Sequence, residues 1–584
     1  MTGKRKSPPF EAVEREQQLE FLLFSGRYDE VLERTSRSND PAAMLAEIGA
    51  LALSGRLDEA RSAFSTFRRD ADDTELRAQA RFFVVAGLCH AGYAGQALRL
   101  VRSSLGDLPS ADTRTRFWIW QGLALVRYFE GRFDRARAAG RRALGSAVQA
   151  SFPYARVLAL DLLAHILVHT GALHAGLRLL NQAADLAEAL GYADNTVTLR
   201  TSSIVHELEY LLRDIDTALT MATQALERPE VSYFTKRSGL IELAKAWALK
   251  GSAARARAAL AEARTIALPG SDRRGKSRWL GGQAMVTALS VGRRAARPIL
   301  AEARHAADGH APLLAELAFI GVVFVSDRDA LGDEVAALAR ATGMARAQLA
   351  AAWAQGTDLS SAATAEDGLS RALLRCWAAA PMARLEILVD EGLLGLVPWA
   401  LHEEPGRRLI LLGEKVVCED HGEVTHGPAP IGPSRRVLTA LAGGYRSREE
   451  LAAMVWGLGR YVPNKHSAVI NTAISRLRGV LPEPGWIVTS DDGYHLASGV
   501  EVVVSDTTPS VEPAEPPPPD DEVTLLRALA RGDCSSAQAA QVLGVSSSSA
   551  LRTLRRMVAD GRVRRIGSGR TTRYALVDST EIDD

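Results

Sequence analysis

The stretch RFWIWQGLALVRYFEGRFDRA, residues 116–136, carries the pattern that decides the fold. It predicts an apolar helix, a turn at Gly131 and a second helix in which Ala136 follows the glycine by five positions. Glycine accepts the left-handed backbone conformation that commonly ends a helix. A small residue five positions later lets the second helix pack closely against the first. The stretch therefore predicts a pair of packed helices.

The same turn recurs along the first half of the chain. Its instances are GRYDEV from Gly26, GRLDEA from Gly55, GYAGQA from Gly92, GRFDRA from Gly131, GALHAG from Gly171, RDIDTA from Arg213, GSAARA from Gly251 and GRRAAR from Gly292. Successive instances begin 29, 37, 39, 40, 42, 38 and 41 residues apart. A helix pair that cannot bury its apolar face alone must stack on its neighbours. Residues 10–340 are therefore predicted to form a helical-repeat arm.

This pattern resembles the tetratricopeptide repeat, in the longer form found in bacterial regulators. The resemblance implies a superhelical solenoid whose concave surface receives a protein, a peptide or a small ligand. A scaffold or oligomerisation arm without a ligand stays open as an alternative, and so does a homodimer. The aromatic run with Trp118, Trp120 and Tyr128 is the expected place for a groove, although most of its rings are expected in the core.

The segment 341–405 connects the arm to the next domain and has no clear fold in the sequence, with helical and β patterns mixed. LEILVDEGLLGLVPWAL (385–401) predicts a strand, a turn and a second apolar element. RRLILLGEKVVCEDHGEVTHG (407–427) predicts two or three short strands that precede the helices of the next domain.

Residues 431–503 contain three helix patterns and a hairpin pattern. SRRVLTALAGG (434–444) is amphipathic, and SREELAAMVWG (447–457) begins with the capping box Ser447–Glu450. KHSAVINTAISRLRGVL (465–481) has one apolar stripe, and GWIVTSDDGYHL (485–496) predicts a hairpin. The predicted stripe consists of Val469, Ile470, Ala473, Ile474, Leu477 and Leu481.

This order of elements is similar to the DNA-binding domain of OmpR-type response regulators, and with the preceding strands it predicts a winged helix-turn-helix domain over 406–503. The resemblance implies that the third helix lies in the major groove of DNA. It places five residues at the DNA: Lys465, Asn471, Ser475, Arg476 and Arg478. Arginine is suited to guanine edges and phosphates, and asparagine to adenine. The wing residues Asp491 and Asp492 add negative charge, which favours the alternative that the domain contacts a protein.

A Pro-rich acidic stretch predicts a linker over 504–520. The helix patterns EVTLLRALARG (522–532), SSAQAAQVLGV (535–545) and SSSSALRTLRRMVADGRV (546–563) follow it. RVRRIGSGRTTRYALV (562–577) predicts a hairpin at the end. Residues 521–577 thus resemble the winged helix of MarR-like repressors.

The second predicted winged helix is strongly basic, with eight Arg against one Asp between Ser546 and Arg573. Phosphate neutralisation accounts for such a patch. The predicted DNA contacts are Ser547, Ser548, Arg552, Arg555, Arg556, Arg562, Arg564, Arg565, Arg570 and Arg573.

Composition and motifs limit the classes of function that the chain can have. The four cysteines are far apart and form no CxxC pair, so neither a metal site nor a redox pair is indicated, and no cofactor is expected. No HExxH or GxSxG motif occurs, and we expect no enzyme. No membrane segment or secretory signal is expected, which indicates a cytoplasmic protein. The sequence predicts a mainly α protein, a helical solenoid followed by two α+β winged helices, that binds double-stranded DNA as a transcriptional regulator. The alternative is a non-enzymatic adaptor or scaffold, of the kind that serves in defence, that uses the winged helices to contact proteins.

Overall fold

The computed structural model describes residues 18–504 and 521–577, with gaps at 25, 37, 71–72, 267–271, 308, 326–327, 357–365, 402, 531 and 568–571. The predicted linker over 504–520 lies outside the described residues except for Val504. The described chain is mainly α and is built from helical repeats, as the sequence predicts. It separates into two compact units, residues 1–505 and 506–584.

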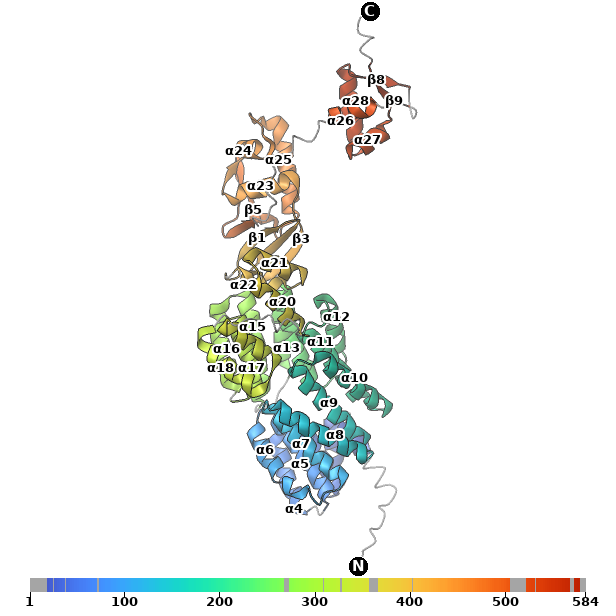
Figure 1. Cartoon of the computed structure of the whole chain (residues 1–584), viewed down its shortest axis with the longest axis vertical. Coiled ribbons are helices and arrows are strands. Elements are labelled where there is room, and N and C mark those ends of the chain that lie inside the picture. The colour runs from blue at the N-terminus through green and yellow to red at the C-terminus, as the bar shows by residue number, and fades with distance from the viewer. Residues whose placement is uncertain are drawn as a thin grey trace, which may run out of the picture. The chain divides into compact units, whose positions relative to one another are not determined.

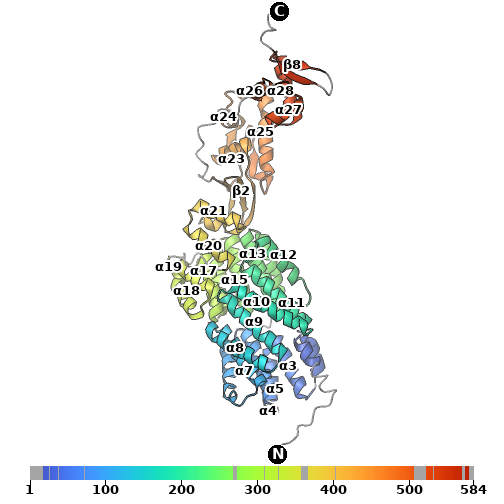
Figure 2. The same cartoon turned by 45° about the vertical axis from the view of Figure 1, so that its right-hand side comes forward.

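The first unit begins with a long series of helices, in which consecutive helices pair and the pairs stack (Figures 1 and 2). Their bounds are α2 Tyr28–Thr35, α3 Pro41–Leu53, α4 Leu57–Asp70, α5 Thr74–His90, α6 Ala94–Arg102, α7 Thr113–Phe129, α8 Phe133–Gln149, α9 Pro153–His169, α10 Leu173–Ala189, α11 Ala193–Glu209, α12 Ile215–Leu226, α13 Tyr233–Lys250, α14 Ala253–Thr265, α15 Arg273–Ser290 and α16 Arg293–Ala307. We call this series, together with α17 to α19 below, the arm.

The predicted turns lie between paired helices of the arm. Gly131 separates α7 from α8 and has a φ of 74°, the left-handed conformation that the turn requires. Ala136 is fully buried between the two helices. The glycines at 26, 55, 92, 171, 251 and 292 also have positive φ, and at the non-glycine turn before Arg213 the residue Leu211 takes that role. The repeat predicted from the sequence is therefore confirmed.

The remaining helices of the first half of the chain and beyond carry the series past residue 340. They are α17 Ala311–Val323, α18 Arg328–Thr342, α19 Ala345–Gln355, α20 Gly368–Ala378, α21 Pro381–Asp390 and α22 Val397–Ala400. The predicted strand within 385–401 is wrong, because α21 covers its first half and short helical turns cover the rest. Leu385, Leu388 and Val389 are buried at i, i+3 and i+4 spacing, which is a helical period that a short apolar run hides.

A four-stranded sheet follows, in the order β3-β2-β1-β7. Its strands are β1 Arg407–Leu412, β2 Lys415–Asp420, β3 Glu423–Pro428 and β7 Val500–Val504. The first three are antiparallel neighbours, as predicted for 407–427, and β7 lies parallel to β1. The parallel pair returns the chain to this sheet after the helices that follow β3.

The four-stranded sheet lies between two hydrophobic cores of the first unit. Side chains of a strand alternate between the two faces, and here both faces are buried. Leu409 and Leu411 of β1 pack with the helices after the sheet, whereas Ile410 and Leu412 belong to the core of the arm. The start of β3 also contacts the arm, since the backbone N–H of Val424 donates to the carbonyl oxygen of Gly251 at 2.7 Å. Figures 1 and 2 both show the sheet between the arm and α23.

Three helices and a hairpin lie on the far face of the sheet. Their elements are α23 Gly432–Ala442, β4 Arg446–Ser447, α24 Arg448–Trp456, α25 Pro463–Arg478, β5 Ile487–Thr489 and β6 Gly493–Leu496. The strands form a second sheet in the order β4-β6-β5. The predicted capping box of Ser447 and Glu450 starts α24, with both of its hydrogen bonds present. We call this part, with the four-stranded sheet, the first helix–hairpin module.

The second unit has its own small core, formed by residues such as Leu525, Ala550, Leu554, Met557 and Tyr574. Its elements are α26 Asp521–Leu529, α27 Ser536–Leu543, α28 Ser547–Ala559, β8 Val563–Ile566 and β9 Arg573–Leu576. Strands β8 and β9 are antiparallel. The predicted order of three helices and a hairpin is therefore observed. We call this unit the second helix–hairpin module.

Candidate functional site

Helix α25 presents an exposed stripe away from the core of the first module. Lys465, Val469, Thr472 and Arg476 are all exposed, and their spacing of four, three and four residues keeps them on one helical face. The prediction that Val469 belongs to the apolar core stripe is wrong, because its side chain is 48% exposed. Ile470, Ala473, Ile474 and Leu477 already complete the buried stripe, and Val469 lies just outside it.

Three predicted DNA contacts flank that stripe. Ser475 is exposed, and so is Asn471, whose side-chain oxygen accepts a hydrogen bond from the hydroxyl of Tyr494 at 2.7 Å. Arg478 is only partly exposed. Its guanidinium donates to the carbonyl oxygen of Ile487 at 2.6 Å and to the hydroxyl of Thr489 at 2.8 Å. Arg478 therefore holds strand β5 against α25, and its contact with DNA stays a prediction.

The tip of the hairpin in the first module is tied to α24. The backbone N–H of Arg448 donates to the carbonyl oxygen of Asp492 at 2.8 Å, and its guanidinium donates to that of Asp491 at 3.3 Å. The hydroxyl of Tyr445 contacts the carboxylate of Asp492, and this contact raises the pKa of Tyr445. The two acidic residues thus have defined neighbours at the hairpin tip.

The arginines of the second module point away from its core. Ser546 caps α28, and Ser547, Ser548, Arg552, Arg555 and Arg556 are all exposed on that helix.

On the hairpin, Arg564, Arg565 and Arg573 are exposed, as is Arg562 just before it. Arg573 is paired with Asp533 at 3.3 Å, and Arg570 lies outside the described residues. The structure thus brings the α28 and hairpin arginines together on one small unit.

The arm contains a cavity that the sequence does not reveal. It has a volume of about 330 Å³ and is lined by helices from α5 to α17, with Leu53 from α3 and Met344 from the turn before α19. Its polar lining includes Gln121, Asp161, His165, His206, Glu209, Arg274, Arg278, His310 and Glu316, and its apolar lining includes Phe82, Phe83, Leu125, Phe129, Tyr154 and Leu158. Of the aromatic run expected to form a groove, Tyr128 lines the cavity while Trp118 is in the core.

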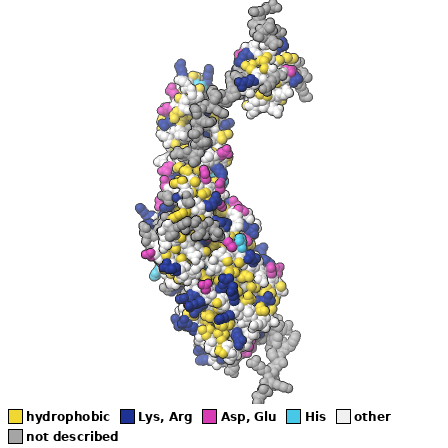
Figure 3. Space-filling model, in the orientation of Figure 1, with side chains coloured by type: hydrophobic (Ala, Val, Ile, Leu, Met, Phe, Trp, Pro, Cys, Tyr) yellow, Lys and Arg dark blue, Asp and Glu magenta, His cyan; other side chains and the backbone are white. Residues whose placement is uncertain are grey.

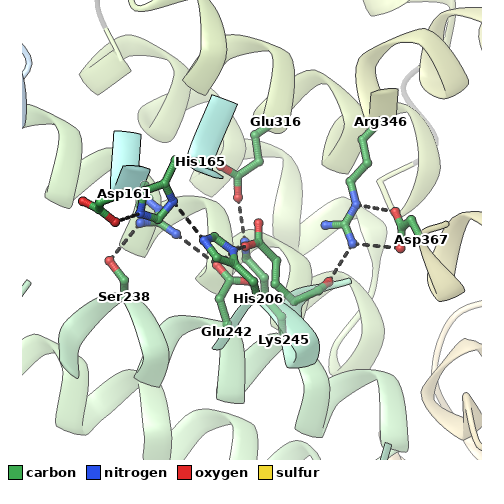
Figure 4. A network of polar contacts seen from close by, with 11 residues as sticks. Asp161, His165, His206, Ser238, Glu242, Lys245, Glu316, Arg346 and Asp367 are labelled. Atoms are coloured by element: carbon green, nitrogen blue, oxygen red, sulfur yellow. Dashed lines mark hydrogen bonds and ion pairs between the residues drawn. The ribbon is translucent and has the colours of Figure 1, made fainter. Parts of the chain in front are cut away.

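Four side chains form a continuous polar chain beside the cavity (Figure 4). His165 lies 3.3 Å from Asp161, and its Nδ1 lies 3.0 Å from Nε2 of His206. Nδ1 of His206 lies 3.0 Å from the carboxylate of Glu209. Two imidazoles therefore connect two carboxylates from helices α9 and α11.

Two neutral imidazoles can make both hydrogen bonds of this chain. Each hydrogen bond needs one proton between its two heavy atoms, and a neutral imidazole supplies one. His165 can therefore donate to His206, and His206 can donate to Glu209. The burial of His206 lowers its pKa, while its hydrogen bond with Glu209 acts in the opposite direction. For Glu209, burial opposes ionisation, but the contact with His206 and the charges of Arg346 and His169 together outweigh it, and the net pKa is lowered.

A buried ion network adjoins the histidine chain (Figure 4). The ammonium of Lys245 contacts Glu242 at 3.0 Å and Glu316 at 2.7 Å, and Arg278 contacts Glu242 at 3.2 Å. Burial raises the pKa of Glu242, which has the most enclosed side chain of the network. Burial acts in the same direction on Glu316, but the charges of Lys245 and Arg278 outweigh it and lower the pKa of Glu316 to about 2.

Arg346 connects the network to the helices beyond the repeats. Its guanidinium contacts both carboxylate oxygens of Asp367, at 2.7 and 3.2 Å, and donates to the carbonyl oxygen of Glu209 at 2.6 Å. It also lies over the ring of Tyr210, 4.4 Å from its centre. Arg346 therefore joins the end of α11, which carries the histidine chain, to the start of α20.

The surface of the arm is mixed in character. In Figure 3, basic side chains gather over the N-terminal part of the arm, with hydrophobic and acidic side chains between them. Among the described helices, none is long and apolar enough to cross a membrane. In the same part of the chain, no group of three or more His, Cys, Asp or Glu side chains is arranged to hold a metal ion.

Comparison with known proteins gives structural neighbours of low sequence identity. No protein-family model and no curated protein matches the chain. A Rap protein in complex with competence and sporulation factor is similar at 12% identity, with a TM-score of 0.44, over 61% of this chain and 100% of that protein. The apo form of the quorum sensor NprR from B. thuringiensis is similar at 12% identity, with a TM-score of 0.35, over 61% of this chain and 97% of that protein.

Proposed function

We propose that the protein is a DNA-binding transcriptional regulator whose arm senses a ligand. In this proposal both helix–hairpin modules are winged helices, with α25 and α28 as the helices that enter the major groove. No chemical step is assigned to any residue, and the protein is proposed not to be an enzyme.

The observation that carries the proposal is the distribution of charge on the second module. Ala550, Leu554 and Met557 bury one face of α28, and the arginines of this helix occupy the exposed remainder. Arg564 and Arg565 extend the same basic character onto β8. A duplex presents phosphates on both sides of its grooves. A basic helix beside a basic hairpin has the opposite charge, and a helix is an element that fits the major groove.

The first module supports the same function through different residues. Its exposed stripe offers a cation at Lys465, a cation and planar donor at Arg476, and the methyl groups of Val469 and Thr472 between them. Arginine can pair with guanine, and methyl groups can contact thymine. We propose that this stripe reads bases, whereas the arginines of the second module bind phosphates.

The shared sheet supports a connection between the arm and DNA. Its β1 strand contributes Ile410 to the core of the arm and Leu409 to the core beneath α23 and α25. A change in the packing of the arm would therefore reach the first module through side chains in direct contact, without crossing a flexible connection.

The test is selection of duplexes from a random library by the full chain, followed by affinity measurement on the selected site. We expect enrichment of a short sequence and loss of affinity in a variant with Arg552→Ala and Arg555→Ala. The matched control carries Arg294→Ala and Arg297→Ala, two exposed arginines on α16 of the arm. Equal affinity of both double variants for every duplex would contradict the proposal.

A second candidate function is an adaptor that binds a protein through the first module. The observation that favours it is the pair Asp491 and Asp492 at the hairpin tip, because two carboxylates there repel phosphates. If selection by the full chain enriches no duplex, while the full chain captures a protein that Asp491→Asn and Asp492→Asn release, the adaptor is the better description.

A further inference from the structure

One part of the cavity collects hydrogen-bond donors around a single ring. The guanidinium of Arg274 lies over the ring of Phe129, 5.1 Å from its centre. The imidazoles of His90 and His310 contact the same ring, with centroids at 5.2 and 5.9 Å. All four residues line the cavity.

Arg274 has no ion-pair partner among the described residues. Two carboxylates favour its charged form, those of Asp272 and Glu316. Asp272 accepts a hydrogen bond from the backbone N–H of Gly275 at 2.7 Å, and Glu316 is bound to Lys245. Burial lowers the pKa of Arg274, yet a guanidinium stays charged in proteins. A partly buried cation therefore lines the cavity without an anion of its own.

His310 supplies a neutral donor in the same place. Its Nδ1 accepts a hydrogen bond from the backbone N–H of Leu313 at 3.3 Å, so in the neutral ring the proton is on Nε2. That Nε2 is buried and has no partner among the described residues, and the whole residue is only 9% exposed. Burial lowers the pKa of His310 to about 4, so the ring is neutral near pH 7.

Two further polar atoms that line the cavity lack partners within the described part of the chain. They are Nδ1 of His169 and the side-chain oxygen of Gln121, which are both buried. Buried polar atoms are almost always hydrogen-bonded to protein, water or a ligand. The cavity of about 330 Å³ lies at the lower end of the range for small-molecule sites, roughly 300–1,000 Å³, and exceeds the roughly 30 Å³ of one water molecule.

We infer that this cavity binds a small organic monoanion, a carboxylate with an apolar or aromatic body, whose charged group is held by Arg274 and by Nε2–H of His310. The body of the ligand packs against the apolar wall. The wall residues are Phe82, Phe83, Leu125, Tyr154 and Leu158. The inference deepens the proposed function and rests on it, since it names the class of ligand that the arm senses.

The charges argue for one negative charge rather than two. Arg274 is a single cation without a partner, and Glu316 lines the same cavity with a carboxylate. A dianionic phosphate monoester would find only one cation, Arg274, without a partner. Its second negative charge would be repelled by the Glu316 carboxylate in a site where charges are poorly screened. A carboxylate can accept hydrogen bonds from Arg274 and His310 at once, and its single negative charge balances the single charge of Arg274.

The inference is tested by calorimetric titration of the full chain with three probes of similar shape. The probes are phenylpropionate, its uncharged amide phenylpropionamide, and phenyl phosphate. We expect the carboxylate to bind about tenfold or more tightly than the amide, because a hydrogen bond to a charged group contributes more than a neutral one. We expect phenyl phosphate to bind more weakly than the carboxylate.

Variants assign the preference to the named residues. Arg274→Met keeps most of the side-chain volume and should remove the preference for the acid over the amide. His310→Asn keeps an acceptor that can cap α17 and should weaken binding of the acid more than binding of the amide. Lys276→Met, which removes an exposed cation from the same helix, is the matched control and should behave as the wild type.

Two results would overturn the inference. One is that the acid does not bind the wild type, or binds no tighter than the amide. The other is that Arg274→Met, with an unchanged melting temperature, keeps the acid preference. Duplex binding is measured on the same samples, so a failure of the proposed function is seen separately. Loss of acid binding with intact DNA binding rejects only the ligand class, and the reverse rejects only the DNA-binding function.

Discussion

Tyr494 of the hairpin and Asn471 of α25 are joined by a hydrogen bond of 2.7 Å from the phenol hydroxyl to the amide oxygen. The bond fixes which way the amide of an exposed residue faces, because the Nδ2 donors must then point away from Tyr494. An asparagine that pairs with adenine needs both its oxygen and its nitrogen. The hairpin therefore controls what Asn471 can offer to DNA.

We predict that Tyr494→Phe lowers the free energy of unfolding by about 1 kcal/mol, the usual net value of one hydrogen bond. It should also change base preference at one position of the selected site, because the amide is then free to rotate. Differential melting and duplex selection measure the two effects. Tyr461→Phe is the control, since it removes a hydroxyl contact of the same length to Ser467. Base preference altered equally by both variants would count against the role of Asn471.

Arg476 and Arg478 should behave differently although they are two residues apart. Arg476→Ala should weaken binding to the preferred site by about 1–3 kcal/mol and leave the melting temperature unchanged, because its side chain is on the exposed stripe. Arg478→Ala should lower the melting temperature, because two hydrogen bonds to β5 are lost. Anisotropy titration and calorimetry separate the two. If Arg476→Ala leaves site preference intact while Arg552→Ala abolishes it, specificity belongs to the second module.

The second module should supply much of the dependence on salt. Replacing both Arg564 and Arg565 by Ala should weaken binding to all duplexes alike and reduce the magnitude of the salt slope by up to about 2, roughly one per phosphate contact. Titrations at several salt concentrations measure the slope. A double variant whose slope equals that of the wild type would show that these two side chains do not contact phosphates.

The helix pair around the Gly131 turn should not tolerate a larger residue at the buried position 136. Ala136→Met should destabilise the protein by about 1–3 kcal/mol, because Ala136 is fully buried between packed helices. Chemical unfolding of the full chain gives the value. Ala138→Met places the same side chain on the exposed face of α8 and should have little effect. Equal effects of the two substitutions would mean that helix propensity, not packing, accounts for the loss.

Acid should destabilise the arm through its buried histidines. Burial lowers the pKa of His90 and of His169 to about 3 and that of His310 to about 4, whereas an unfolded histidine titrates near about 6.5. The stabilisation is therefore fully present above about pH 6.5 and is lost as the pH falls toward the folded values, at up to about 1.4 kcal/mol per pH unit for each ring.

His169→Gln should remove the contribution of one titrating ring to this dependence of stability on pH. Urea unfolding of the full chain, followed from about pH 7 to pH 5, should show a shallower loss of stability for His169→Gln than for the wild type. His305→Gln, on the exposed surface of α16, serves as the control and should keep the steeper loss. A slope that His169→Gln leaves unaltered would rule out this ring as a contributor.

Local chemistry made the helices and turns predictable. The left-handed glycines of the arm, the small residue five positions after most of them and the Ser447–Glu450 capping box each have a sequence signature that works over a few residues. The misplacements have local causes too. A ten-residue helix at 381–390 shows too few turns to reveal its period, and Val469 adjoins the core stripe without entering it.

The cavity could not be predicted, because its residues come from helices spread over more than two hundred positions. Glu242 and Lys245 illustrate the difficulty. At a spacing of three residues on one helix they have the pattern of an exposed ion pair, yet both are buried. Which buried charges meet depends on how far each helix pair rotates relative to the next, and no local pattern encodes that rotation.

The four-stranded sheet limits how this protein could have been assembled from parts, or could be recombined with others. Ile410 and Leu412 on one face, and Leu409 and Leu411 on the other, divide one strand between two hydrophobic cores. A gene fusion that transplanted only the segment after residue 430 would leave the strands behind, and one that began at 406 would expose the face made for the arm. Exchange of the first module between proteins therefore requires a matching partner surface, whereas the second module, with a core of its own, can be gained or lost as a single piece.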